Sequence, residues 1–164
     1  MSSHTFNGIK FEATKPLRPV GVAELESAER ALGYRFPSDY REFVLRFGSG
    51  EFEELTLRVF SPFEILEMTP DDRARFSEHW FWDDSPNVWT QEQAVESVAC
   101  FDGGSGDDIR FHPADPETIY LLPHEDTVIH KFSSFADIVR HFQREFAPES
   151  DKLTFVQYGK CAEQ

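Results

Sequence analysis

The stretch LGYRFPSDYREFVLRFGSG, residues 32–50, contains the end of one predicted helix and the whole of a second. Gly33 suits the position after a helix C-terminus, where a left-handed backbone favours glycine. Pro37 suits the first turn of the next helix, because proline loses no hydrogen bond there. The apolar residues of this second helix recur at i, i+3, i+4 and i+7, which is the spacing of one buried face: Tyr40, Phe43, Val44 and Phe47. The stretch therefore predicts two amphipathic helices joined by a short turn, with the glycines of residues 48–50 ending the second.

The sequence on either side continues the pattern. Before this stretch, a polar lead precedes a helix whose apolar positions are Val22, Leu25, Ala28 and Leu32. After it, residues 55–60 alternate in hydropathy as a strand does. Ser61 and Glu64 then form a capping-box pattern, which predicts a short helix through residues 65–68. Thr69, Pro70 and Asp72 predict the start of a further helix.

From Val98 onward the chain changes to short apolar runs separated by turn compositions. These runs predict four strands: residues 98–101, 108–111, 118–122 and 127–132. Ser134 then caps a helix whose apolar face is Phe135, Ile138, Val139, Phe142 and Phe146. Residues 153–158 alternate again and predict either a last strand or a segment that packs against the body. Strands with short connections form an antiparallel meander, so we predict a single α+β domain over residues 1–164, with helices packed against an antiparallel, possibly mixed sheet.

The composition is typical of one folded domain with a sizeable core. Of 164 residues, 40% are hydrophobic and 15% aromatic, which excludes fibrous and disordered classes. No apolar run approaches the roughly 20 residues that span a bilayer, and MSSHTFNGIK lacks the apolar stretch of a secretory signal. Cys100 and Cys161 make neither a disulfide framework nor a zinc motif. We therefore expect a cytoplasmic protein without a membrane partner.

Negative charge is concentrated in one part of the chain. The formal net charge is -14, and residues 83–126 hold eleven acidic side chains against one basic side chain, Arg110, a charge of -10. Such a field repels nucleic acid and anionic membranes and attracts basic partners. A solvated acidic surface that only keeps the protein soluble has the same composition, and the sequence leaves both interpretations open.

The stretch FDGGSGDD, residues 101–108, joins two predicted strands. A phosphate-binding loop needs a lysine beside its glycines, whereas Asp102, Asp107 and Asp108 would repel a phosphate. The spacing of a calcium loop is also absent, because Gly104 and Gly106 fall where ligands should be, leaving only incidental weak cation binding. The glycines instead suit a hairpin turn, since glycine adopts positive φ without strain.

Catalytic signatures are absent from the rest of the sequence. His112, His124 and His130 lie around the predicted meander, but no pair has the helical i, i+4 spacing with a third ligand that a zinc site needs. There is no nucleophile elbow of the G-x-S-x-G type. We therefore expect no enzyme, no metal and no cofactor.

The stretch HWFWDDSPNVW, residues 79–89, places Trp80, Trp82 and Trp89 beside Asp83 and Asp84. Tryptophans at this density usually belong to a core, with at least one packed against the sheet. Tryptophan is also enriched in interface hot spots, and neighbouring acids can pair with Arg or Lys of a basic partner. Both interpretations stay open at this point.

The ordered set of motifs resembles the SUKH superfamily. Residues 32–50 resemble its signature of a helix ending in Leu-Gly, a Leu-Pro step, an acid followed by Tyr, an aromatic three residues on, and a closing Asn-Gly-Gly. SPFEIL, GSGDDIRF and SFADIVRHF resemble later features in the same order, so the resemblance runs from about Val22 to Phe146 and leaves residues 1–21 and 147–164 as peripheral. Phe36 replaces the usual leucine, and Gly48-Ser49-Gly50 replaces Asn-Gly-Gly.

The resemblance implies a domain without enzymatic activity. Many bacterial members are immunity proteins that neutralise a cognate toxin, often a nuclease, and other members are scaffolds or regulators in eukaryotic cells. With the acidic charge, this leads us to expect an immunity protein that occludes a basic, nuclease-type toxin. The alternatives are an adaptor for endogenous proteins and, third, a metal-dependent or hydrolytic enzyme. The candidate partner-binding residues are Trp80, Trp82, Asp83, Asp84, Trp89, Asp102, Asp107, Asp108, Asp115, Glu117, Glu125 and Asp126.

Overall fold

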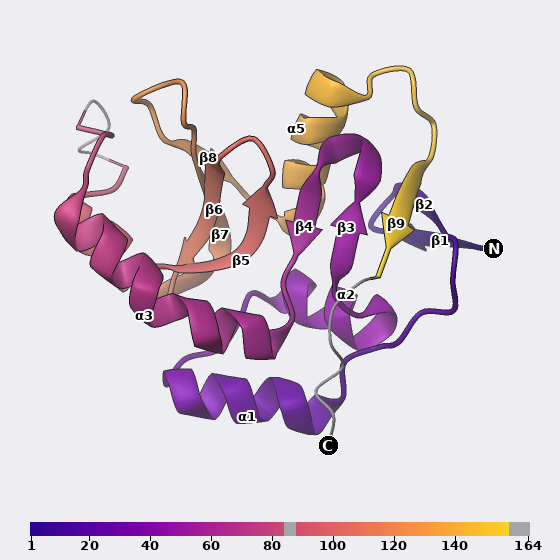
Figure 1. Cartoon of the computed structure of the whole chain (residues 1–164), viewed down its shortest axis with the longest axis horizontal. Coiled ribbons are helices and arrows are strands. Elements are labelled where there is room, and N and C mark those ends of the chain that lie inside the picture. The colour runs from indigo at the N-terminus through magenta and orange to yellow at the C-terminus, as the bar shows by residue number, and fades with distance from the viewer. Residues whose placement is uncertain (84–87, 158–164) are drawn as a thin grey trace.

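One mixed sheet runs through the protein. The computed structural model describes residues 1–83 and 88–157, and over these it has nine strands (Figure 1). The strands are β1 (Ser2–Phe6), β2 (Ile9–Ala13), β3 (Gly50–Phe52), β4 (Leu57–Val59), β5 (Val98–Gly103), β6 (Asp107–His112), β7 (Asp115–Leu122), β8 (His130–Phe132) and β9 (Leu153–Val156). Their order in the sheet is β1-β2-β9-β3-β4-β5-β6-β7-β8. Neighbours are antiparallel except β2 and β9, which are parallel, so the predicted α+β class with a mixed sheet is confirmed.

Five α-helices accompany the strands in the described residues. They are α1 (Val22–Leu32), α2 (Ser38–Phe47), α3 (Pro62–Glu78), α4 (Gln91–Glu96) and α5 (Phe135–Phe146), with a short 3₁₀ turn, η1 (Glu53–Leu55). In Figure 1, α1 and α3 lie along one end of the sheet and α5 stands near its opposite end. None of the described helices is long and apolar enough to cross a membrane.

The two helices predicted from residues 32–50 are present. Gly33 follows α1 with φ of 81°, the left-handed conformation that its position requires. The predicted face of α2 is buried in full: Tyr40, Phe43, Val44 and Phe47. In α1 only Leu25 and Ala28 are buried, while Val22, the first residue of the helix, is 56% exposed. The predicted core face of α1 is therefore shorter than the sequence indicates.

The two helices expected around residues 61–72 are one helix, and this expectation was wrong. The capping box of Ser61 and Glu64 is present, but α3 continues through Pro70. Proline removes one backbone hydrogen bond within a helix. Here Pro70 is exposed, and Thr69 Oγ1 donates to the carbonyl of Ile65 at 2.7 Å. The carbonyl that Pro70 leaves without a helical donor is that of Leu66, four residues earlier, and the exposed position of Pro70 places this loss on the outer side of α3.

The segments expected to be peripheral belong to the sheet. Residues 2–13 form the hairpin β1–β2, and β9 pairs with both β2 and β3. They contribute the buried rings of Phe6, Phe11 and Phe155 to the main core. The signal for this hairpin in the sequence is the dipeptide Asn7-Gly8. Both residues have positive φ and form the two-residue turn typical of Asn-Gly.

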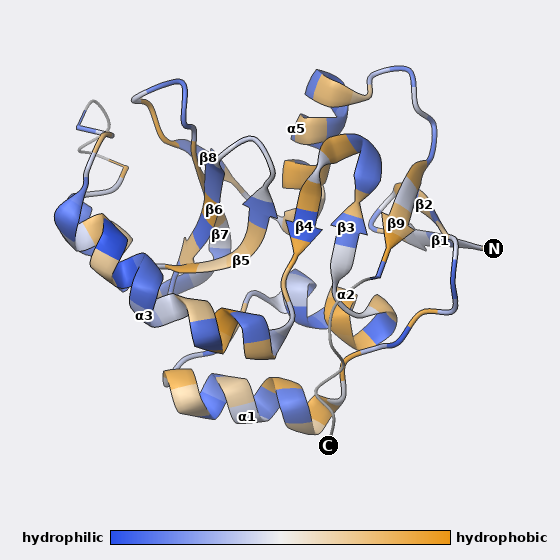
Figure 2. Ribbon diagram, in the orientation of Figure 1, coloured by the Kyte–Doolittle hydropathy of each residue, from blue (hydrophilic) through white to orange (hydrophobic). Residues whose placement is uncertain are grey.

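Two apolar clusters cover opposite faces of the central strands. On one face, Phe101 of β5 stacks on Phe135 of α5 with ring centroids 4.7 Å apart, and Phe135 lies 5.0 Å from Phe43 of α2. On the other face, the second cluster comprises Phe76, Trp82, Trp89, Ala94, Tyr120, Leu122 and Ile129. Alternation along β7 sends Leu121 to the first cluster and Tyr120 to the second. Figure 2 shows apolar and polar residues alternating along the strands and helices.

Candidate protein-binding surface

The acids of residues 83–126 divide between the two ends of the sheet. Asp108 of β6 pairs with Leu122 of β7, whereas His112 pairs with Asp115. These two pairs are four residues apart along β6, which corresponds to about 13 Å at the rise of an extended strand. Asp107 and Asp108 are therefore at one end of the sheet and Asp115 at the other, so the acidic segment does not form one continuous face.

Three chain segments come together at the first of these ends. They are residues 79–83, the β5–β6 turn and the loop at residues 123–129. Trp82 Nε1 donates to the carbonyl of Pro123 at 2.8 Å, which fixes the first segment to the third. The backbone N–H of His124 donates to Asp107 at 3.0 Å, which fixes the third to the turn. We call this surface the acidic end and define it by Asp83, Asp102, Asp107, Asp108, Glu125 and Asp126.

The tryptophans predicted as contact residues are mostly interior. Trp82 and Trp89 are 5% and 2% exposed, and the ring of Trp89 stacks on Tyr120 with centroids 4.2 Å apart. Trp80 is partly buried against the same cluster. A partner cannot reach Trp82 or Trp89 in this conformation, so the interpretation that the tryptophans belong to the core holds for these two. Asp84 lies outside the described residues.

Two of the predicted acids are engaged within the molecule. Asp107 lies 2.6 Å from Nδ1 of His124, and this hydrogen bond, before any other cause, raises the pKa of His124. Asp108 accepts from Arg75 at 2.7 Å and lies 3.8 Å from Arg110. The side chains of Asp107 and Asp108 are only 15% and 17% exposed. The carboxylates of Asp107 and Asp108 are therefore held by contacts within the molecule, and little of either side chain is accessible to a partner.

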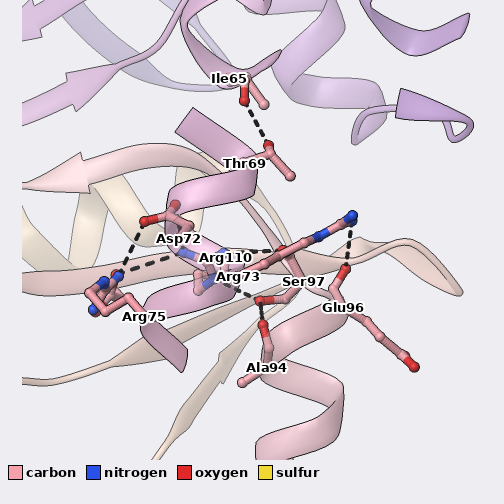
Figure 3. A network of polar contacts seen from close by, with 10 residues as sticks. Ile65, Thr69, Asp72, Arg73, Arg75, Ala94, Glu96, Ser97 and Arg110 are labelled. Carbon is pink, nitrogen blue, oxygen red and sulfur yellow. Dashed lines mark hydrogen bonds and ion pairs between the residues drawn. The ribbon is translucent and has the colours of Figure 1, made fainter. Parts of the chain in front are cut away.

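A buried arginine joins this end to the helices behind it. Arg110 Nε donates to Ser97 Oγ at 2.6 Å, its Nη2 donates to the Ser97 carbonyl at 3.1 Å, and its Nη1 pairs with Asp72 at 3.1 Å. The guanidinium also lies 4.6 Å from the ring centroid of Phe76. Figure 3 shows how this side chain connects β6, α3 and the start of β5. Burial lowers the pKa of Arg110, and Asp72 counteracts that effect.

Asp102 differs from its neighbours in the acidic end. Its side chain is exposed and forms no hydrogen bond or ion pair of its own with the described residues. Partial burial of its carboxyl, followed by the charge of Asp108, raises its pKa, while Arg58 on the neighbouring strand lowers it. An unpaired carboxylate that is disfavoured in this way gains energy when a cation approaches it.

The remaining acids of this end are the most accessible. The side chain of Glu125 is 85% exposed and lies 3.3 Å from Nε2 of His124. Asp126 is exposed and accepts from the backbone N–H of Thr127 at 2.7 Å, which shapes the loop. Asp83 is exposed as well. Glu125, Asp126 and Asp83 are therefore the carboxylates of the acidic end that are most accessible from outside the molecule.

The other two predicted acids lie at the far end of the sheet. Glu117 accepts from the backbone N–H of Ser38 at 3.1 Å and from its hydroxyl at 2.7 Å. This places a carboxylate at the start of α2, where the helix dipole favours negative charge. Asp115 is exposed and accepts from Thr118 Oγ1 at 2.7 Å. Neither residue belongs to the acidic end.

Two apolar side chains near the acidic end were not among the predicted contact residues. Phe81 is 64% exposed and Val128 is 42% exposed. The signal for Phe81 was present in the order Trp80-Phe81-Trp82, because an extended segment that buries its first and third side chains turns the second outward. Aromatic side chains such as that of Phe81 are enriched in protein contact surfaces relative to the rest of a protein's surface. Among the described residues, no three His, Cys, Asp or Glu side chains are grouped so that they could hold a metal ion.

The structure is thus an α+β domain with a mixed sheet and several accessible carboxylates at one end of that sheet. Residues 19–141, well over half of the chain, match the family model described as the SMI1 / KNR4 family (SUKH-1), and the chain belongs to this family. Membership supports a non-catalytic immunity or regulator domain that acts through protein–protein interaction. No curated protein matches the chain.

Proposed function

We propose that this protein is an immunity protein that binds a basic toxin domain through the acidic end and blocks it by occlusion. The observation that carries the proposal is the grouping of accessible carboxylates on three adjoining segments, represented by Asp83, Asp102 and Glu125. Phe81 lies in the same first segment and is 64% exposed, so it offers apolar contact area beside the charges. A nuclease must attract phosphate and therefore carries positive charge that such a surface complements.

Long-range attraction and short-range contact have separate roles in this proposal. The acids steer a basic partner toward the surface, which raises the association rate at low salt. The apolar side chains contribute after contact, when they lose water. Association should therefore slow by an order of magnitude or more between low and physiological salt, while dissociation changes little. An association rate that does not change with salt would contradict the steering step.

Co-expression with a toxin domain encoded next to this gene tests the proposal directly. The wild-type protein should restore growth, and a triple variant Asp83→Lys, Asp102→Lys, Glu125→Lys should not, because it reverses the charge of the acidic end. The matched control carries the same change of charge at Glu24, Glu26 and Glu149, which are exposed and lie outside this end. Rescue by both variants, with circular dichroism showing both folded, would refute the role of the acidic end. Lack of rescue by the wild-type protein against every neighbouring toxin would refute the immunity function.

A second candidate function is an adaptor that binds endogenous proteins. The observation in its favour is the division of the acids, since Asp115 and the acidic end lie at opposite ends of β6 and β7. Two separated charged surfaces can contact two partners at once. Affinity purification from the native cell distinguishes the two functions, because an adaptor retains several endogenous proteins and an immunity protein retains one toxin.

A further inference from the structure

A groove with positive charge lies on this strongly acidic protein. It has a volume of about 540 Å³ and runs between α5 and the edge strand β8. Its lining includes Lys131, Arg140 and Arg144, with Asp137 as the acidic member. The chain as a whole carries 30 acidic and 16 basic side chains. A groove lined by more basic than acidic residues therefore has the opposite sign of charge to the protein as a whole.

The acidic member of the lining is already satisfied. Asp137 accepts from Ser133 Oγ at 2.6 Å and pairs with Arg140 at 3.2 Å, and these contacts, the first above all, lower its pKa. Within the described residues, Arg144 forms no ion pair. The Lys131 ammonium lies 5.9 Å from the ring centroid of Tyr120, on the face of the sheet opposite to α5, so its charge is directed away from the groove. Arg140 also donates to the carbonyl of Asn7. The groove therefore keeps the positive charge of Arg144, which its own acid, paired with Arg140, does not balance.

The backbone of the groove offers hydrogen bonds as well as charge. β8 is the last strand in the sheet order, so within the described residues one edge of its backbone pairs with no strand. Such an edge is a template for an added strand. The ring of Phe132 lies 5.2 Å from that of His141, which holds α5 beside this edge. An extended peptide on β8 would therefore have α5 as its neighbour.

The spacing of the cations matches an extended peptide. Arg140 and Arg144 are four residues apart on α5, which corresponds to about 6 Å along a helix axis. Alternate side chains of a strand point to the same face and are about 6.6–6.8 Å apart. Carboxylates at positions i and i+2 of a bound strand would thus have the same repeat as these two guanidinium groups.

We propose that this groove binds an extended acidic segment of a partner protein, which adds a strand to β8 and turns alternate carboxylates toward Arg140 and Arg144. The segment has the opposite charge to the partner of the acidic end, so this site is a second interaction surface. It does not depend on the proposed immunity function. The groove volume is within the roughly 300–1,000 Å³ of well-defined ligand sites, which suits a short segment rather than a whole domain.

Fluorescence anisotropy with labelled peptides tests the site. The probe is an eight-residue peptide in which Glu alternates with Thr, and its control has the same composition with the four Glu residues contiguous. We expect the alternating peptide to bind at least tenfold more tightly than the control. Arg144→Glu should weaken its binding at least tenfold, whereas Arg30→Glu, an equal change of charge at an exposed position of α1, should weaken it less than threefold.

Backbone methylation separates strand addition from simple charge attraction. Two probes carry N-methyl groups on alternate residues and differ only by a shift of one residue. Because only every second N–H of a paired strand faces its neighbour, one probe should lose binding at least tenfold and the other should keep it. Equal binding of both probes, or equal loss in Arg144→Glu and Arg30→Glu, would overturn the proposal, as would the absence of binding to the wild-type protein at millimolar peptide.

Discussion

Arg110 should be one of the most sensitive positions for stability in this protein. Its side chain is completely buried and pairs with Asp72, which is 23% exposed. Replacing it by alanine removes the cation but leaves its partners in place. We expect Arg110→Ala to lower the free energy of unfolding by about 3–5 kcal/mol, as for other buried pairs from which one partner is removed.

The contacts of Arg110 show where this energy arises. The bond to Asp72 at 3.1 Å is charge-assisted, and its loss costs about 1.5–3 kcal/mol. The carbonyl of Ser97 loses the donor at 3.1 Å, and a buried acceptor left without a partner costs about 1–3 kcal/mol. Asp72 and Asp108 both keep Arg75 as a partner, which limits the charge effect and favours the lower half of the range.

Urea unfolding measured by tryptophan fluorescence is the appropriate assay, because Trp82 and Trp89 belong to the cluster next to Arg110. Arg30→Ala is the matched control, since Arg30 is an exposed residue of α1, and such a surface substitution should change the free energy of unfolding by only about 0–0.5 kcal/mol. The double variant Arg110→Met, Asp72→Asn should lose about 1–3 kcal/mol less than the sum of the single variants. An Arg110→Ala protein within 1 kcal/mol of wild type, with the same dependence on urea, would refute this reasoning.

Three further outcomes follow from the structure. In an NMR titration the pKa of His124 should lie above its usual value of 6.5, and it should fall toward that value in Asp107→Asn. The pair of His124 with Asp107 should stabilise the protein below pH 6.5, and this stabilisation should disappear as the pH rises through the raised pKa. Folding raises the pKa of Asp102. Its ionisation should therefore lower the stability of the protein as the pH rises above about 4. Asp102→Asn should accordingly have a higher urea midpoint than the wild-type protein at neutral pH, but not at pH 3. Gly50→Ala should destabilise the protein by about 1–3 kcal/mol, because its Cβ would lie 2.5 Å from the Val156 carbonyl, and an unchanged melting temperature would contradict that clash.

Periodicity predicted the parts of the fold whose pattern is local. The stripe of α2 and the four runs from residue 98 onward depend on neighbours within one element, and all of them have counterparts in the structure. β8 is shorter than predicted, at His130–Phe132. The position of β9 could not be predicted, because its pairing with Phe11 and Phe52 joins residues far apart in the sequence.

The candidate site was predictable only as a composition. The excess of acids in residues 83–126 is visible in the sequence, but their division between two ends depends on the register of β6 against β7. The partners of Asp107 and Asp108 are His124 and Arg75, 17 and 33 residues away in the sequence. No local pattern shows that these two aspartates are engaged while Asp102 is not.

The position of β9 also determines how late in synthesis the sheet can be completed. β2 precedes its second neighbour in the sheet, β9, by most of the described chain. Domains generally fold as units during synthesis, beginning at the N-terminus. The edge of β2 that faces β9 therefore stays unpaired until residues 153–156 have been synthesised and β9 enters between β2 and β3. A nascent chain stalled before residue 153 should therefore be the form of this protein most exposed to chaperones and to aggregation.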